Sequence, residues 1–334
     1  MDSMPRDSFN REIDYLRISV IDRCNLRCVY CMPLDGIRFM PTAAMLTASE
    51  IETVVRAAVS AGFRKFRLTG GEPLLRADIV EIAERIAGIP GVAGLALTTN
   101  AILLEELAAP LKRAGLARVN VHLDSLDPAI VERQMRGGTY DAIWRGIMAA
   151  EAAGLAPIKL NAVVTAGYNE ESVADLARLT IDREWHVRFI ELMPLGGGEC
   201  ARVAIARYVS NIETRRRIEA ALGPLEEIPG GNPADESRNF RLRGARGVVG
   251  FISPVSEPYC GTCNRMRLTA DGKFHLCLLN DDELDVAKAL RSDGGDPIPR
   301  VAQILRRAVE FKPTGHHLLE GRSTRDRSMY QLGG

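Results

Sequence analysis

The sequence lacks an excess of either charge, because it contains 43 Lys and Arg against 43 Asp and Glu. Proteins that bind nucleic acid or a membrane surface through charge usually carry a basic excess, so we expect neither partner. The sequence also lacks a run of about 18 apolar residues, and no transmembrane helix is expected. Residues 1–17 carry charges throughout and hold no apolar signal-peptide core, which predicts a cytoplasmic location.

Internal repeats and low-complexity tracts are also absent. Short β-rich segments alternate with helical segments, and strands are expected to begin near residues 16, 65, 94, 118, 158 and 185. Such alternation is typical of parallel βαβ units. We therefore predict an α/β fold with a partial (β/α)6 barrel, and a doubly wound open sheet is the alternative. Gly62, Gly115 and Gly154 each follow a helical run and are expected to cap it.

A polar stretch rich in Gly and Pro, PGGNPADES at residues 229–237, interrupts this pattern. Such a composition is typical of a break between structural units. We predict a barrel domain over residues 1–225 and a C-terminal extension over residues 226–334. The length of the chain, 334 residues, also favours two domains.

Five of the expected strands are polar on one face, because successive strand residues point to opposite sides. These polar faces hold Arg17 with Ser19; Lys65 with Arg67 and Thr69; Thr98 with Asn100; Asn120 with His122 and Asp124; and Lys159 with Asn161. The filled core of a closed eight-stranded barrel is apolar. The pattern therefore predicts a wet, cationic cavity, and solvated edge residues are the alternative.

The seven cysteines form two groups of three and one isolated residue. The groups are Cys24, Cys28 and Cys31, spaced C-x3-C-x2-C, and Cys260, Cys263 and Cys277, spaced C-x2-C-x13-C. Clustered cysteines in a chain without export signals are typical of metal sites rather than disulfides. For the isolated Cys200 we expect no ligand role.

Three thiolates can hold three irons of a four-iron cluster and leave the fourth iron open, as in a catalytic centre. A structural zinc site usually has four protein ligands, so zinc would need a distant fourth ligand here. A non-enzymatic electron carrier with two clusters would be expected to have complete four-cysteine sets. Both of these interpretations remain alternatives at this stage.

The motifs resemble those of a known family. C-x3-C-x2-C after the first strand and TGGEP (residues 69–73) after the second resemble the radical S-adenosylmethionine (SAM) superfamily. CNRMRLTADG, RFIELMP and the terminus RSMYQLGG resemble the GTP 3′,8-cyclases of molybdenum cofactor (molybdopterin) biosynthesis, over nearly the whole chain. A radical SAM enzyme that modifies peptides is the rival interpretation. The resemblance implies a radical SAM partial barrel with a C-terminal extension that carries a second iron–sulfur cluster.

The resemblance also implies roles for single residues. Two [4Fe-4S] clusters would be held by Cys24, Cys28 and Cys31 and by Cys260, Cys263 and Cys277. SAM would contact Tyr30, Gly71, His122 and Met193, where His122 replaces the serine usual in the family. GTP would contact Arg17, Lys65, Arg67, Thr98, Lys159, Arg265, Met266 and Arg267. Catalysis would involve Arg17 and the terminal Gly333 and Gly334, which would reach the active site.

The implied reaction begins when a 5′-deoxyadenosyl radical removes the C3′ hydrogen of GTP. Attack on guanine C8 then gives (8S)-3′,8-cyclo-7,8-dihydroguanosine 5′-triphosphate. The chain has no G-x4-G-K-[ST] loop, so arginines with their bidentate donors are expected to bind the triphosphate. The implied partners are a reductant protein and the downstream cyclic pyranopterin monophosphate synthase, and the enzyme is expected to be a monomer or homodimer.

Overall fold

The computed structural model describes residues 4–333, and its centre is a ring of parallel strands. The strands are β1 (Tyr15–Ser19), β2 (Lys65–Thr69), β3 (Gly94–Thr99), β4 (Arg118–His122), β5 (Lys159–Val164) and β6 (His186–Glu191). They pair in chain order, each parallel to the next. A doubly wound sheet would reverse its strand order partway, so the alternative is excluded and the (β/α)6 arrangement is confirmed.

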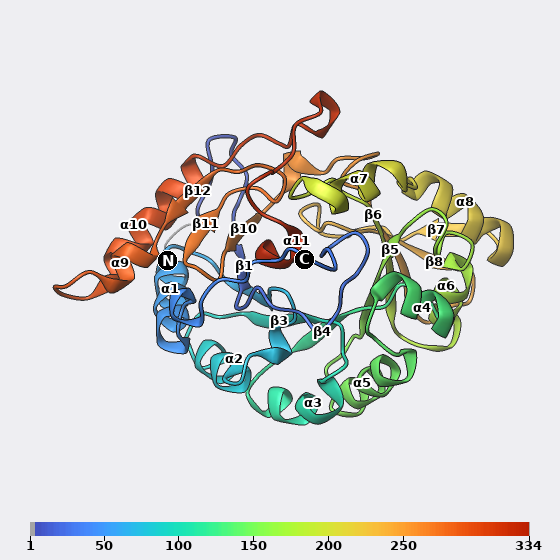
Figure 1. Ribbon diagram of the computed structural model, residues 1–334, viewed down its shortest axis with the longest axis horizontal. Helices are drawn as coiled ribbons and strands as arrows, with labels where there is room; N and C mark the ends of the chain where they lie inside the picture. The colour runs from blue at the N-terminus through green and yellow to red at the C-terminus, as the bar shows by residue number, and fades with distance from the viewer. Residues whose placement is uncertain (1–3, 334) are drawn as a thin grey trace.

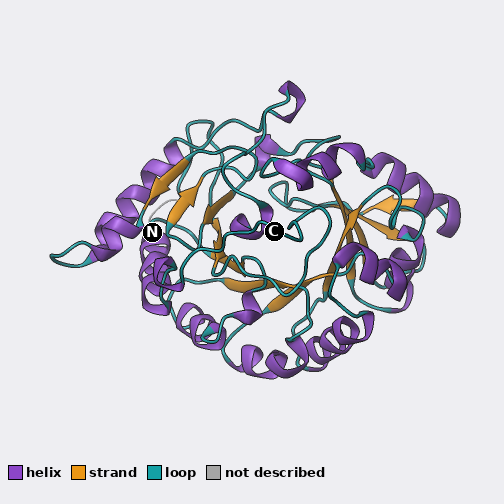
Figure 2. Ribbon diagram, in the orientation of Figure 1, coloured by secondary structure: helices purple, strands orange, loops and turns teal. Residues whose placement is uncertain are grey.

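Helices cover the outside of this curved sheet (Figure 1). The connecting helices are α1 (Ala48–Ser60), α2 (Ile79–Ala87), α3 (Leu104–Arg113), α4 (Pro128–Met135), α5 (Tyr140–Ala152) and α6 (Val173–Asp182). Their apolar sides pack on fully buried strand residues such as Leu16, Ile18 and Leu68. The helices lie on the outer side of the strands (Figure 2), so the polar strand faces are left to the inside, where Arg17, Arg67 and Thr98 line a cavity.

Local sequence signals place the helix ends. Thr47 and Glu50 form a capping box that begins α1. The expected caps Gly62, Gly115 and Gly154 all have positive φ, at 99°, 91° and 73°, just after α1, α3 and α5. This conformation suits glycine because it has no Cβ.

The C-terminal third extends the same sheet at both ends. β9 (Val248–Ile252) pairs parallel with β6, and β10 (Arg265–Leu268) pairs parallel with β1. Antiparallel strands continue each end: β8 (Arg238–Leu242) and β7 (Leu225–Glu227) beyond β9, and β11 (Lys273–His275) and β12 (Glu283–Asp285) beyond β10. The boundary expected after residue 225 falls inside β7 and stays a prediction.

The remaining helices are α7 (Gly198–Ala206), α8 (Asn211–Leu222), α9 (Ala287–Arg291), α10 (Pro297–Glu310) and α11 (Met329–Leu332). Short 3₁₀ turns occur at η1 (Thr42–Ala44), η2 (Pro73–Leu75), η3 (Cys260–Thr262) and η4 (Leu318–Glu320). α11 lies within the ring rather than on its outer surface (Figure 1). Among residues 4–333, no helix is both long and apolar enough to cross a membrane.

Candidate active site

One cavity inside the ring brings together both cysteine groups and most of the residues expected in the site. The expected residues that line it are Arg17, Cys24, Cys28, Tyr30, Cys31, Arg67, Gly71, Thr98, His122, Met193, Cys260, Cys263, Arg265, Arg267 and Cys277. A cavity with arginines in its lining is therefore present on the inner face, as the strand pattern predicts, and its being wet stays a prediction. The individual ligand contacts stay predictions.

Three of the expected GTP contacts do not line this cavity, and neither does Gly333. Lys65 is nearly half exposed and its Nζ lies 2.9 Å from Asp14 Oδ2. Met266 is fully buried on the apolar face of β10. Lys159 lies near the cavity, where burial and the charges of Arg188 and Arg118 lower its pKa to about 8.

The first cysteine group lies on the loop that follows β1. Its sulfurs receive polar contacts: Leu26 N donates to Cys24 Sγ at 3.4 Å, and Asn100 Nδ2 lies at 3.9 Å. Burial raises the pKa of Cys24 to about 12 and that of Cys31 well above its usual range, with Cys28 adding to both. Three adjacent buried thiols ionise only beside a strong cation, so this donor set fits an iron cluster.

Glycines 70 and 71 of the TGGEP turn let β2 approach the cysteine loop. A Cβ on Gly70 would lie 2.4 Å from Ile21 O, and one on Gly71 would lie 2.2 Å from Arg23 O. Glu72 is buried and accepts hydrogen bonds from Thr99 Oγ1 at 2.8 Å and from the backbone N–H of residue 100 at 2.7 Å. The motif therefore fixes the turn against the cysteine loop as well as lining the cavity.

His122 takes part in a buried network beside the first cysteine group. Its Nε2 lies 2.5 Å from Tyr30 Oη and 3.1 Å from Asp124 Oδ2, and Tyr30 Oη donates to Asp124 at 2.7 Å. Burial disfavours the imidazolium, but the Asp124 carboxylate outweighs this effect and raises the pKa of His122 to about 10. The Asp124 carboxylate thus favours the protonated form of the imidazole.

The second cysteine group has cationic surroundings. Burial opposes ionisation of Cys263, but the charges of Lys312 and Arg265 outweigh it and lower its pKa to about 6. Burial likewise opposes ionisation of Cys260, whose pKa a hydrogen bond with His316 lowers on balance. Thiolates are the form that binds iron, so Cys260 and Cys263 suit a cluster, whereas burial raises the pKa of Cys277, which would ionise on binding the metal.

The two cysteine groups lie at opposite ends of the neighbouring parallel strands β1 and β10. The first group follows β1, whereas Cys260 and Cys263 precede β10. Cys277 follows β11, which is antiparallel to β10 and therefore returns the chain to the same end. The cavity joins the two ends.

A row of arginines crosses the cavity wall between them. Arg17 on β1 is in register with Arg67 on β2 and with Arg267 on β10, and all three are at least 93% buried. Neighbouring strands are only about 4.8 Å apart, so these like charges repel unless an anion lies between them. Burial, together with Arg17 and Arg265, lowers the pKa of Arg267 to about 9.

Two residues of this wall were missed by the sequence analysis. Arg188 on β6 is buried and donates to Asn161 Oδ1 at 2.9 Å and to Asn120 Oδ1 at 2.8 Å. The alternation used for the other strands would have identified Arg188, because in HVRFIE it stands between two apolar residues. Glu236, from the loop before β8, lies among the arginines, and no periodic signal marks it.

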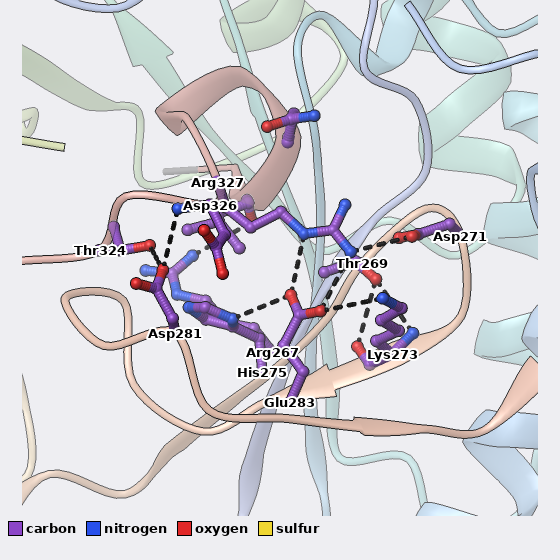
Figure 3. Close-up of polar contacts among 12 residues, drawn as sticks. Arg267, Thr269, Asp271, Lys273, His275, Asp281, Glu283, Thr324, Asp326 and Arg327 are labelled. Atoms are coloured by element: carbon purple, nitrogen blue, oxygen red, sulfur yellow. Dashed lines mark hydrogen bonds and ion pairs between the residues drawn. The ribbon is translucent and has the colours of Figure 1, made fainter. Parts of the chain in front are cut away.

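The C-terminal tail is tied to the β10–β12 sheet and enters the ring (Figure 3). Arg327 pairs with Glu283 and Asp271, each at 2.9 Å, and Asp281 accepts from the backbone N–H of residues 325 and 326 at 3.0 and 3.2 Å. Beyond this anchor, the Gly333 carbonyl accepts a hydrogen bond from Arg267. Gly333 thus reaches the arginine row, and Gly334 lies outside the described residues.

Comparisons with known proteins first define the class. A Radical SAM superfamily model matches residues 18–180, and a Molybdenum Cofactor Synthesis C model matches residues 185–318. The structure of SuiB from Streptococcus suis bound to its precursor peptide is similar, with a TM-score of 0.62 and 16% identity over 87% of this chain and 64% of SuiB. The chain is therefore a radical SAM protein, a class that implies a [4Fe-4S] cluster and SAM.

Full-length relatives then identify the family. The GTP 3′,8-cyclase of Pelotomaculum thermopropionicum is 48% identical over 98% of this chain and 100% of its own length. That of Moorella thermoacetica is 46% identical over 98% and 100%. The chain belongs to the GTP 3′,8-cyclase family, so the family expected from the motifs is confirmed. The peptide-modifying, electron-carrier and zinc alternatives are set aside.

Proposed function

We propose that this chain converts GTP into (8S)-3′,8-cyclo-7,8-dihydroguanosine 5′-triphosphate for molybdenum cofactor biosynthesis. The observation that carries the proposal is the in-register row Arg67–Arg17–Arg267, placed between two three-cysteine groups in one cavity. A triphosphate supplies the multiple negative charge that such a row requires. Membership in the GTP 3′,8-cyclase family supports the same substrate.

We assign one [4Fe-4S] cluster to Cys24, Cys28 and Cys31 and a second to Cys260, Cys263 and Cys277. When bound, the first cluster and SAM supply the 5′-deoxyadenosyl radical that takes the C3′ hydrogen of GTP. Tyr30, Gly71, His122 and Met193 line the cavity near the first cysteine group and are the proposed SAM contacts. His122 can donate a hydrogen bond to an anionic group such as a carboxylate.

The chain's own residues hold GTP in place. Arg17, Arg67, Arg265 and Arg267 are the proposed triphosphate contacts, and Thr98 has a buried hydroxyl that makes no hydrogen bond among the described residues. Lys159 adds a cation near Arg188. Fixing both reacting centres in one orientation, away from water, is the contribution a protein makes to such chemistry.

We propose that the tail completes this site, with Arg267 linking it to the arginine row. A Cβ on Gly333 would lie 2.5 Å from Thr69 Oγ1 and 2.7 Å from Gly70 N, so only glycine fits between these groups. A reductant protein and cyclic pyranopterin monophosphate synthase are the proposed partners. Cytoplasmic location and a monomeric or dimeric state stay predictions.

The test is an anaerobic reaction of reconstituted protein with SAM, GTP and dithionite, followed by chromatography of both products. We expect Cys24→Ala to abolish 5′-deoxyadenosine formation and cyclisation together. Cys263→Ser should abolish cyclisation but leave the iron content of the first cluster unchanged. Cys200→Ala is the matched control, with wild-type yields expected. Cyclisation by Cys263→Ser at the wild-type rate would refute the role of the second group.

A further inference from the structure

The loop between β7 and β8, residues 228–237, carries a carboxylate into the arginine row. Glu236 Oε2 lies 2.6 Å from Arg17 Nη2 and 2.9 Å from Arg265 Nη1. Its Oε1 lies 3.6 Å from Arg67 Nη1 and 3.9 Å from Arg188 Nη1. The Glu236 side chain is only 12% exposed, so one carboxylate is the shared counterion of four buried guanidinium groups.

Without a bound ligand, the four arginines depend on the Glu236 carboxylate to balance their charge. Burial by itself would raise the pKa of Glu236, but the charges of Arg17 and Arg67 outweigh it and hold the pKa well below its usual range. Removing a counterion that buried charges share is costly, since their desolvation is then less compensated. Glu236 therefore stabilises the free protein by offsetting the mutual repulsion of the four arginines.

The carboxylate nevertheless leaves much of the site unfilled. Among the described residues, three buried donors of this wall have no hydrogen-bond partner: Arg17 Nε, Arg67 Nε and Thr98 Oγ1. Buried donors are rarely left without a partner, because each costs about 1–3 kcal/mol. A carboxylate has two oxygens, so the donor set fits a larger anion with many oxygens.

We propose that Glu236 is an internal competitor, which occupies the triphosphate subsite in the free enzyme and is displaced when substrate binds. This inference rests on the proposed binding of GTP to the arginine row. The guanidinium N–H groups that hold the carboxylate, Arg17 Nη2 and Arg265 Nη1, are among those that a triphosphate would require. A triphosphate that enters beside this carboxylate would also place several negative charges close to it, which is repulsive.

The loop is built so that it can withdraw. Residues 229–233 are exposed, and Gly230 has φ of 77° with open space around it. The loop's turn is closed within itself by Asn232, whose Oδ1 accepts from the N–H of residue 234 at 2.9 Å. Its second contact with the wall, from Arg265 Nη1 to Ala234 O at 3.2 Å, also uses a cavity arginine. One anion can therefore replace both attachments.

The test compares Glu236→Gln with wild-type holoenzyme in calorimetric titrations, using inorganic tripolyphosphate and then GTP. We expect Glu236→Gln to bind tripolyphosphate on the order of tenfold more tightly, because the competing charge is gone. Glu227→Gln is the matched control, since it removes one charge from exposed β7 and should bind as wild type does. Equal or weaker binding by Glu236→Gln overturns the proposal, because a carboxylate that organises the arginines for substrate would have that effect.

A second measurement needs no substitution and covers the case in which Glu236→Gln does not fold. Hydrogen exchange of residues 229–237 in wild-type holoenzyme should become faster when tripolyphosphate is added. Slower or unchanged exchange in this segment overturns displacement. If the wild type binds tripolyphosphate but not GTP, the proposed function fails, and the comparison of tripolyphosphate binding by the two proteins still tests the role of Glu236. If neither protein binds either anion, both proposals fail.

Discussion

The tail offers the sharpest test of how the site is assembled, through the substitution Gly333→Ala. Gly333 has φ of 71°, and an added Cβ would lie 2.4 Å from Thr69 Cγ2 and 2.7 Å from Gly70 N. The backbone of residue 70 is fixed by the turn against the cysteine loop, so it cannot move aside. The alanine must therefore leave the position that the glycine occupies.

The magnitude follows from two costs. At φ of 71° and ψ of 148° the backbone adopts a conformation that is essentially restricted to glycine, which costs a residue with a Cβ about 1–3 kcal/mol, and the clash adds to this. A total near 2 kcal/mol shifts the ratio of docked to undocked tail by about 30-fold. When the tail leaves its position, both costs disappear. The substitution therefore cannot lower the free energy of unfolding by more than the docked tail contributes to it. Folding and both clusters are expected to survive, whereas productive hydrogen transfer should fall on the order of 10- to 100-fold.

The assay incubates the variant with SAM and C3′-deuterated GTP and measures deuterium in 5′-deoxyadenosine. Gly321→Ala is the matched control, because Gly321 has φ of 73° but a Cβ there meets nothing within 4 Å. The control also replaces a glycine of positive φ, but in the αL conformation with ψ of 14° rather than 148° and without the clash, and its deuterium transfer should equal that of the wild type. Wild-type transfer by Gly333→Ala would show that the tail does not shape the reacting geometry. Deleting Gly333 and Gly334 together should have at least as large an effect.

Three further outcomes are expected. Arg17→Ala should weaken GTP binding by about 1.5–3 kcal/mol while SAM binding hardly changes; equal losses for GTP and guanosine in titrations would contradict a triphosphate contact. Burial and the charges of Arg188, Arg118 and Arg67 lower the pKa of Lys159 to about 8, and Asp235 opposes them. Tripolyphosphate affinity should therefore fall as the pH rises through 8, more steeply in the wild type than in Lys159→Arg. Parallel pH profiles of the two proteins would refute the role of Lys159. Arg327→Met removes two ion pairs, so hydrogen exchange of residues 324–333 should accelerate while that of β1–β6 stays unchanged; uniform protection would show that Arg327 does not anchor the tail.

The barrel could be predicted because the alternation of strand residues and the glycines that end the helices are both local features of the sequence. Alternation placed Arg17, Arg67 and His122 on the inner face, and glycines after helical runs marked the caps. Alternation gives the face of a residue but not its level along the strand. Lys65 begins β2, where Asp14 lies within 2.9 Å, so its ammonium group pairs there before it reaches the cavity.

The parallel additions β9 and β10 could not be predicted in the same way. β10 pairs with β1, which precedes it by about 250 residues, and no local pattern encodes such a pairing. Glu236 is a similar case, since its position depends on four arginines from four different strands. Motif resemblance predicted the cysteine groups and the tail, but not the residue that neutralises the wall between them.

The pairing of β1 with β10 also fixes the distance between the two cysteine groups of the candidate active site. The cysteine groups lie beyond opposite ends of this pair, and a five-residue strand at about 3.3 Å per residue spans roughly 15 Å. No side-chain substitution can alter that span, because it is set by the backbone rise. Removing two residues from β1 would keep every remaining side chain on its face yet shorten the span by about 7 Å. Under the proposed function, the backbone therefore sets the distance that the substrate must span, and that distance changes only by insertion or deletion.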